Sequence, residues 1–270
     1  MSNIFATGTS GTIGKHFVSK VSAIDIDLRG PEKAFIIPKI SPSNFVLHAA
    51  GIVGTAKVNS DPEQSYAINV NGSTKLAEFA RDINIARFVF VSSAHVYAKT
   101  EKILTESSDI NPTTLYAKQK FEAEKNIIEI FEGRKEKLCI VRVFSVLDWD
   151  SDDFTLGGAI TRLTRLNLNE TLINVDDVRD FLTPKQVANA LVAITNKTSL
   201  TGIVNLCSGI GTSVLSAARK MLEVRGLPFP TERILRGKSD NPYIVGDNSK
   251  LTSYLPNLDL SWAPSTRADF

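Results

Sequence analysis

Short apolar runs alternate with segments of helical periodicity over the first half of the chain. The runs are apolar at nearly every position, which is typical of strands buried on both faces. Strands that alternate with helices predict a parallel sheet with right-handed crossovers and helices on both sides. The pattern therefore predicts an α/β doubly wound (Rossmann) fold with strands at Ile4–Ala6, Ile24–Leu28, Phe45–Ala49, Arg87–Val91 and Leu138–Val143.

Two long helices are predicted between these strands. The first spans Asp61–Ile83 and starts with an Asp-Pro pair, which suits an N-cap and a first helical position. The second spans Asn111–Phe131 and carries an apolar stripe that includes Ala123 and Ile127. Further elements are expected as helices at Gly158–Leu166 and Asp247–Tyr254 and as a short strand at Thr171–Val175.

The alternation breaks near residue 145, where a Ser/Asp-rich stretch begins. We expect a nucleotide-binding domain over residues 1–145. Residues 146–270 are expected to form a small substrate-binding lobe, interleaved with the last elements of the sheet. This lobe should lie at the carboxyl edge of the sheet, where ligands bind in doubly wound folds.

Composition narrows the class of protein. The 270 residues include 31 Lys and Arg against 29 Asp and Glu, a formal charge of +2, so we expect no nucleic-acid partner. Cys139 and Cys207 lie in apolar runs without CxxC spacing, which favours buried thiols in a reducing cytoplasm. Neither a signal segment nor an apolar run of about 20 residues occurs, so we expect a soluble protein that does not span a membrane. Three histidines and two cysteines form no metal-ligand cluster, so we expect no metal site.

A glycine-rich loop follows the first strand. Gly8, Gly11 and Gly14 are spaced as in a loop that turns tightly and lets backbone N–H groups approach a pyrophosphate. We expect a helix to start in this loop, with Ile13, Phe17 and Val21 on its apolar face. A plain strand-to-helix turn is the alternative.

A dinucleotide site also needs a group for the adenine ribose about 20 residues further on. Asp27 lies at that distance from Gly8 and would accept from a 2′-hydroxyl, which favours NAD. Arg29 would instead meet a 2′-phosphate, which favours NADP. The choice stays open, and a solvated strand end is the alternative role for Asp27.

A second candidate constellation lies downstream. Tyr116 and Lys120 are four residues apart, so both lie on one face of the predicted helix. An ammonium near a phenol stabilises the phenolate, which makes tyrosine a usable acid or base. Ser92 and Ser93 follow the strand that ends at Val91, at the sheet edge where ligands bind.

These residues resemble the extended short-chain dehydrogenase/reductases, the NAD(P)-dependent epimerase/dehydratase group that modifies nucleotide sugars. The resemblance implies that Tyr116 is the catalytic acid/base, that Lys120 lowers its pKa and holds the nicotinamide ribose, and that Ser93 binds the reacting oxygen. It also implies a homodimer through the two long helices. The matching motifs are Thr7 to Gly14 (TGTSGTIG, with Ser10 and Thr12 in the cofactor loop), His48 to Gly51 (HAAG, with Ala49 and Ala50 lining the cofactor), Asn69 to Gly72 (NVNG, with Asn69 at the cofactor), Ser92 to Tyr97 (SSAHVY) and Tyr116 to Lys120 (YAKQK).

The resemblance extends into the C-terminal half through Arg179-Asp180-Phe181 and implies a helix at Val187–Ile194. It implies that Arg179 contacts a substrate diphosphate, for which a guanidinium is well shaped. Arg236 is a candidate second phosphate ligand. The alternative for Arg179 is a surface ion pair with Asp176 or Asp177.

Three departures from the family pattern concern the substrate and adenine pockets. Ser145 stands where the family commonly has Asn, which changes the sugar contacts. Ala94 and His95 replace the Asp-Glu pair of sugar dehydratases, which disfavours elimination, and His95 is either a substrate-facing acid or a structural histidine. The short interval between Asp27 and His48 predicts a lightly covered adenine site.

Four functions remain open on this reading. We favour a 4-ketosugar reductase, because a lightly covered adenine site should release spent cofactor readily. A nucleotide-sugar 4-epimerase, which must retain its cofactor, is the next alternative. A dehydrogenase of a non-nucleotide alcohol and a non-enzymatic cofactor sensor are the others, the last disfavoured by the intact Ser93, Tyr116 and Lys120.

Overall fold

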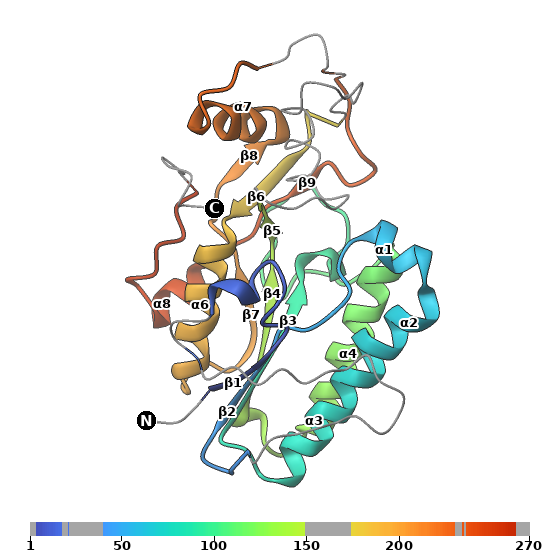
Figure 1. Ribbon diagram of the computed structural model, residues 1–270, viewed down its shortest axis with the longest axis vertical. Helices are drawn as coiled ribbons and strands as arrows, with labels where there is room; N and C mark the ends of the chain where they lie inside the picture. The colour runs from blue at the N-terminus through green and yellow to red at the C-terminus, as the bar shows by residue number, and fades with distance from the viewer. Residues whose placement is uncertain are drawn as a thin grey trace.

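A five-stranded parallel sheet forms the centre of the computed structural model (Figure 1). The structure describes residues 4–17, 21, 40–148, 174–229, 234 and 236–262. The sheet order is β1-β2-β3-β4-β7, and every neighbouring pair is parallel. The predicted doubly wound fold is therefore confirmed. Its strands are β1 (Ile4–Thr7), β2 (Phe45–His48), β3 (Arg87–Ser93), β4 (Leu138–Val143) and β7 (Gly202–Leu206).

Both faces of the sheet are buried, because successive side chains of each strand point to opposite sides. In β3, Phe88 and Phe90 belong to one apolar cluster, and Val89 and Val91 belong to the other. The phenylalanine side is covered by helices from residues 55–130, and the opposite side by the short η1 near the N-terminus together with helices of the second half (Figure 1). The first group comprises α1 (Thr55–Ser60), α2 (Pro62–Tyr66), η2 (Ala67–Gly72), α3 (Ser73–Asp82) and α4 (Leu115–Ile130), and the second η1 (Gly14–His16), α6 (Pro184–Asn196) and α8 (Ser249–Tyr254).

A smaller lobe lies beyond the carboxyl ends of the strands (Figure 1). Its sheet has β6 at the centre, with β5 and β9 parallel to it and β8 antiparallel. A separate apolar cluster, which includes Leu147, Phe181 and Met221, packs under α7. The chain leaves this lobe through α6 and β7, which return to the main sheet, and then enters it again. The lobe elements are β5 (Ser145–Val146), β6 (Val178–Leu182), β8 (Gly211–Ser213), α7 (Val214–Val224) and β9 (Tyr243–Ile244).

Most predicted helices are present with adjusted bounds. The Asp61–Ile83 prediction corresponds to α2, η2 and α3 in succession, so a π-helical stretch interrupts the expected regular helix. The helix expected from Asn111 begins only at Leu115, because Thr114 forms its N-cap and its side chain accepts from the Ala117 N–H. The predicted helices near residues 187 and 247 are confirmed as α6 and α8. The remaining one-turn helices are η3 (Ala94–Val96) and η4 (Lys135–Lys137).

Other predictions fare differently. Asn174 and Val175 lie in a turn that Asp177 closes by donating its N–H to the Asn174 carbonyl, so the strand expected to end at Val175 is wrong there. The rest of that strand, the strand Ile24–Leu28 and the helix Gly158–Leu166 lie outside the described residues. The helix expected after the glycine loop is represented, in its described part, by the single turn η1.

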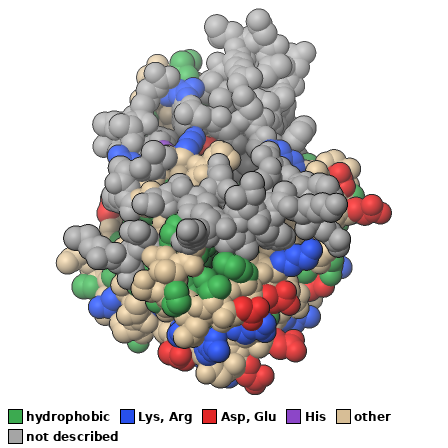
Figure 2. Space-filling view, turned by 60° about the horizontal axis from the view of Figure 1, so that its bottom comes forward, with side chains coloured by type: hydrophobic (Ala, Val, Ile, Leu, Met, Phe, Trp, Pro, Cys, Tyr) green, Lys and Arg blue, Asp and Glu red, His purple; other side chains and the backbone are tan. Residues whose placement is uncertain are grey.

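The distribution of charged side chains on the surface agrees with the small net charge of the sequence. Figure 2 shows acidic and basic side chains mixed with one another over the described part of the face that it presents. Among the described residues, no helix is long and apolar enough to cross a membrane.

Candidate active site

The end of β3 and the first turns of α4 bring the candidate triad together. Ser93 is the last residue of β3, and Tyr116 and Lys120 lie one turn apart in α4. All three side chains are buried, at 6% (Ser93), 8% (Tyr116) and 3% (Lys120) exposure. The structure thus brings together, from two distant segments, the three residues that the sequence analysis predicted to be catalytic.

Lys120 is held against the end of β3. Its Nζ donates to the Val91 carbonyl oxygen at 2.8 Å and lies 4.9 Å from the centre of the Phe90 ring. Burial lowers the pKa of Lys120 to about 8, and the negative charge of Glu124 opposes that shift. The ammonium therefore has a fixed place at the carboxyl edge of the sheet.

Tyr116 lies close to Ser93. Burial raises the pKa of Tyr116 to about 12, and the interaction with the Ser93 side chain acts in the opposite direction. In the protein alone, the phenol is therefore protonated at neutral pH and available as a proton donor. The lowering of this pKa by Lys120, which the resemblance implies, stays a prediction.

His95 lies beside the triad. Its backbone N–H donates to Ser93 Oγ at 3.3 Å, and its ring meets the Tyr116 ring edge-on at a centroid distance of 6.4 Å. The residue is exposed, and desolvation by the surrounding protein lowers the pKa of its imidazole, with a further lowering from the charge of Arg179. His95 therefore lies at the surface beside Tyr116.

The glycine loop packs tightly upon itself and upon the segment after β2. Gly8 has φ +74°, and a Cβ there would lie 2.7 Å from the backbone of Ala49 and Ala50. A Cβ at Gly14 would lie 1.9 Å from the Gly8 carbonyl oxygen, whereas one at Gly11 would lie 3.3 Å from it. Gly8 and Gly14 are thus required by geometry, since no side chain fits there. Ser10, Gly11 and Thr12 are exposed at the tip of the loop, and Ile13 is half-buried against the core.

The segment Ala49 to Ile52 lies between this loop and the triad. Asn69 fixes its far end, because its side chain accepts from the Ile52 N–H at 2.8 Å and donates to the Ile52 carbonyl at 3.0 Å. A Cβ at Gly51 would lie 3.0 Å from Asn69 Oδ1 and 3.5 Å from Lys120 Nζ. Asn69 is fully buried. In this structure it therefore supports the segment Ala49 to Ile52 through its side chain.

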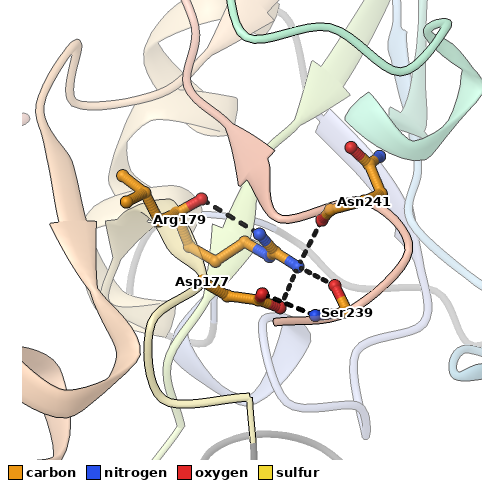
Figure 3. Close-up of polar contacts among 5 residues, drawn as sticks. Asp177, Arg179, Ser239 and Asn241 are labelled. Carbon is orange, nitrogen blue, oxygen red and sulfur yellow. Dashed lines mark hydrogen bonds and ion pairs between the residues drawn. The ribbon is translucent and has the colours of Figure 1, made fainter. Parts of the chain in front are cut away.

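In the lobe, Arg179 is engaged by groups of the protein itself (Figure 3). Its Nη2 lies 2.8 Å from Asp177 Oδ2 and donates to the Asn241 carbonyl at 2.8 Å and to Ser239 Oγ at 3.3 Å. An ion pair of Arg179 with Asp176 or Asp177 was the alternative to a diphosphate contact in the sequence analysis, and the structure shows the pair with Asp177. Burial lowers the pKa of Arg179, and the Asp177 charge opposes this. Arg179 therefore ties β6 to the segment that precedes β9.

The other predicted substrate residues are spread over the lobe. Arg236 is exposed and pairs with Asp176 at 3.0 Å. Ser145 begins β5 and is half-buried. Asp27 and Arg29 lie outside the described residues.

Sequence reasoning missed the roles of two buried residues. Asp180 is fully buried and accepts from the N–H groups of Ser208 and Gly209 and from the Ser208 hydroxyl, so it holds the turn after β7. Gln119 accepts from Asn69 Nδ2 at 2.8 Å and supports that side chain from α4. A carboxylate inside an apolar strand was a signal for Asp180, because a buried charge requires donors. No comparable signal marked Gln119.

The comparison with known families decides the class of the protein. A model of the NAD dependent epimerase/dehydratase family matches residues 4–207, which is most of the chain. The chain belongs to this family. Membership confirms the resemblance stated above, and with it an NAD(P)-dependent enzyme and a nicotinamide dinucleotide as its cofactor.

Relatives within this family differ in their reactions. The chain is 26% identical to a GDP-6-deoxy-D-talose 4-dehydrogenase from Aggregatibacter actinomycetemcomitans, over 94% of this chain and 91% of the relative. It is 24% identical to a UDP-glucose 4-epimerase from Rhizobium leguminosarum bv. trifolii, over 84% and 76% of the two chains. The structure of RMD from Pseudomonas aeruginosa in complex with NADPH superposes with a TM-score of 0.81 at 20% identity, covering 97% of this chain and 95% of RMD, which supports the shared fold.

The residues present fit the cofactor of this family. The glycine loop leaves no room for a Cβ at Gly8 or Gly14, as expected of the first and third glycines of a dinucleotide loop, which permit its tight turn and its close packing. Ser92 Oγ, near the carboxyl end of β3, is buried without a hydrogen-bond partner within the described part of the chain. Both features suit a dinucleotide that crosses the carboxyl ends of β1, β2 and β3.

Proposed function

We propose that this protein is an NAD(P)-dependent nucleotide-sugar oxidoreductase that reduces a keto group at C4 of the sugar. The observation that carries the proposal is the proximity of Ser93 to Tyr116, with Lys120 one turn away in α4 and the His95 ring edge-on to the Tyr116 ring. The reactions of the relatives support the choice of carbon, since both the dehydrogenase and the epimerase act at position 4.

Tyr116 is the proposed proton donor. Reduction of a carbonyl requires a proton at the sugar oxygen, and burial keeps the Tyr116 hydroxyl protonated near neutral pH. Ser93 binds the same sugar oxygen and orients it toward Tyr116. Lys120 holds the nicotinamide ribose and lowers the pKa of Tyr116 when the phenolate forms. The nicotinamide, when bound, supplies the hydride.

The cofactor would be held by backbone and small side chains. The loop Gly8, Ser10, Gly11, Thr12, Ile13 and Gly14 would contact the pyrophosphate, and the segment Ala49 to Gly51 would line the middle of the dinucleotide. Asn69 would support that segment, and Ser92 would meet the nicotinamide half. We propose that Asp27 and Arg29 act at the adenine ribose, where they would decide between NAD and NADP.

The substrate would bind between the triad and the lobe. His95 is proposed to hydrogen-bond a sugar hydroxyl, because its ring is both exposed and next to Tyr116. Arg179 is proposed to attract the diphosphate, since its charge reaches His95 even though Asp177 offsets part of it. Arg236 and Ser145 are proposed to contact the diphosphate and the sugar at the rim.

A 4-epimerase is the second candidate, favoured by the similarity to UDP-glucose 4-epimerases. Two observations favour the reductase over it. The dehydrogenase relative is matched over a larger share of both chains, and the neutral Tyr116 is in the state that a reduction needs. An epimerase must in addition retain its cofactor through the whole cycle.

One experiment separates the two. Gel-filtered protein is assayed with GDP-6-deoxy-D-talose or UDP-glucose, with and without added NAD⁺ or NADP⁺, and dinucleotide absorbance and sugar products are followed. A reductase runs in reverse under these conditions: it oxidises the sugar and gives net reduction of the dinucleotide only when NAD⁺ or NADP⁺ is added. An epimerase interconverts sugars without net conversion. Tyr116→Phe should lower turnover about a hundredfold or more, and unchanged turnover would refute the catalytic assignment.

We further propose a homodimer in the cytoplasm. Tyr66 and Ile128, on α2 and α4, are exposed apolar side chains at 38% and 39%, which supports pairing through these helices. The two free thiols, Cys139 and Cys207, are buried, which suits a reducing compartment. Light scattering tests the dimer, and a monomeric mass would contradict it.

A further inference from the structure

A buried histidine outside the triad connects the two halves of the cofactor site. His48, the last residue of β2, is fully buried and packs near the rings of Phe88 and Phe90. Its Nδ1 lies 2.6 Å from Thr7 Oγ1, at the end of β1, and its Nε2 lies 2.9 Å from Ser73 Oγ, at the start of α3. The catalytic scheme above does not use this group.

The direction of these hydrogen bonds can be worked out from the number of protons. Ser73 Oγ donates its one hydrogen to the Asn69 carbonyl at 2.8 Å, so toward His48 it can only accept. His48 therefore donates from Nε2. A neutral imidazole that donates from Nε2 accepts at Nδ1, so Thr7 donates to His48. Burial lowers the pKa of His48 to about 3, which keeps the ring neutral.

The Thr7 end of this chain fixes the glycine-loop side of the cofactor site. With its hydrogen committed to His48, Thr7 Oγ1 accepts from the Ala50 N–H at 3.1 Å. That bond holds the peptide between Ala49 and Ala50, against which Gly8 packs so closely that a Cβ would lie 2.7 Å away.

The Ser73 end fixes the side next to the triad. Ser73 bonds the backbone of Asn69, and the Asn69 side chain bonds both the N–H and the carbonyl of Ile52. Gly51, between these anchors, faces Lys120, since a Cβ there would lie 3.5 Å from Lys120 Nζ. This oriented chain of hydrogen bonds thus holds the segment Ala49 to Ile52 in place at both ends.

We propose that His48 is a positioning residue for the dinucleotide: its neutral, Nε2-protonated form orients the chain from Ala50 through Thr7, Ser73 and Asn69 to Ile52, and so holds the segment that lines the cofactor. The proposal rests on the nicotinamide cofactor of the family and on the proposed placement of that cofactor.

The test compares dissociation constants of NADH and NADPH, measured by fluorescence on the full-length protein, with thermal unfolding of each variant. Thr7→Val keeps the volume of the side chain but removes the donor, and His48→Leu removes both ring contacts. Each should weaken dinucleotide binding about tenfold, because a buried partner loses its hydrogen bond. The Thr7→Val/His48→Leu double variant should bind no more weakly than the worse single variant, since both break one chain.

Two variants serve as internal controls. His48→Asn places a polar atom near the position of Nδ1 and should restore most of the affinity that His48→Leu loses. Ser73→Ala removes the hydrogen bonds of Ser73 with His48 and with the Asn69 carbonyl. Its dinucleotide dissociation constants replace those of His48→Leu if that variant does not fold. A purely structural role for His48 would lower the unfolding temperature with unchanged dissociation constants, and that result would overturn the proposal.

A spectroscopic measurement tests the proton positions directly. Nitrogen-15 shifts of the imidazole, assigned by comparison with His48→Asn, should show protonation at Nε2 and a bare Nδ1. A protonated Nδ1 would overturn the proposed direction of the chain. If wild-type protein binds neither dinucleotide, the cofactor placement itself fails, which is distinguishable from variants that bind as well as wild type.

Discussion

The ammonium of Lys120 donates to the carbonyl oxygen of Val91 over 2.8 Å, which fastens α4 to the carboxyl end of β3. This contact places a buried cation at the carboxyl edge of the sheet, on the side of the lobe. Burial disfavours the charged form, which is why the pKa of Lys120 lies at about 8 instead of 10.5.

The stability of the protein should therefore depend on pH through Lys120. Between about pH 8 and 10.5 the unfolded chain binds a proton at this lysine that the folded chain has released, so the free energy of unfolding rises with pH. Relative to Lys120→Met, the wild type should gain up to about 1.4 kcal/mol per pH unit in this window. Below pH 7 the difference between the two proteins should be constant. Urea unfolding at a series of pH values measures it, and a flat difference up to pH 10 would contradict the shifted pKa.

The glycine loop should respond in a graded way to an added methyl group. Gly14→Ala would place Cβ 1.9 Å from the Gly8 carbonyl oxygen, whereas Gly11→Ala would place it at 3.3 Å. We expect Gly14→Ala to abolish measurable NADH and NADPH binding and Gly11→Ala to weaken it only modestly. Isothermal titration measures both. Equal effects of the two variants would show that the close approach at Gly14 is unimportant.

Arg87 should contribute to stability without affecting catalysis. It is the first residue of β3, is fully buried, and donates to the carbonyls of Ile194 and Leu200 near the end of α6. Arg87→Met leaves these acceptors unpaired, so unfolding should require about 3 kcal/mol less free energy. Since Ser93 lies at the other end of β3, kcat/KM should be unchanged. The exposed Arg81, which pairs with Asp82, is the matched control, and Arg81→Met should change stability by less than about 0.5 kcal/mol.

Arg179 and Arg236 should differ in their effect on the diphosphate. The Arg179 side chain is 15% exposed, whereas the Arg236 side chain is 72% exposed. Arg179→Met should raise the inhibition constant of GDP or UDP about tenfold, because it removes a positioned charge. Arg236→Met should change it by less than about threefold, as is usual for screened surface charges.

A control accompanies this comparison. Ser239→Ala removes one contact of Arg179 but leaves its charge, so it separates anion binding from the anchoring of the segment before β9. An inhibition constant that rises equally in Ser239→Ala and Arg179→Met would assign Arg179 a structural role alone.

His95 should influence the chemical step through its neutral form. Its pKa lies below the ordinary value of 6.5, so the imidazole is neutral at physiological pH and becomes charged only under more acid conditions. We expect kcat/KM of the wild type to fall at pH values below the ordinary imidazole pKa of 6.5, and His95→Asn to lose this acid limb together with about tenfold of kcat. Dinucleotide affinity should not change. An acid limb that persists in His95→Asn would belong to another group.

The amino-acid pattern by itself predicted four of the five strands of the sheet, the glycine loop and the shared helix face of Tyr116 and Lys120, but not β7. Strands such as β3 bury both faces, so each is apolar throughout and visible as a run, and Tyr116 and Lys120 share a helix, so their spacing alone puts them on one face. Gly8 and Gly14 were identifiable for the same reason, because their constraint is local. The placement of Ser93 beside Tyr116 followed from the rule that ligands bind at the carboxyl ends of parallel strands.

Only the tertiary structure decided which polar groups bond to one another. The pairing of Arg179 with Asp177, the four donors around Asp180 and the oriented chain through His48 join residues from elements that are distant in the sequence. Burial explains their importance, because a polar group removed from water must find partners, and the fold determines which partners lie within reach. His48 illustrates the point, since its sequence context fits a simple strand end, and only its contacts with Thr7 and Ser73 reveal that it links the end of β1 to the start of α3.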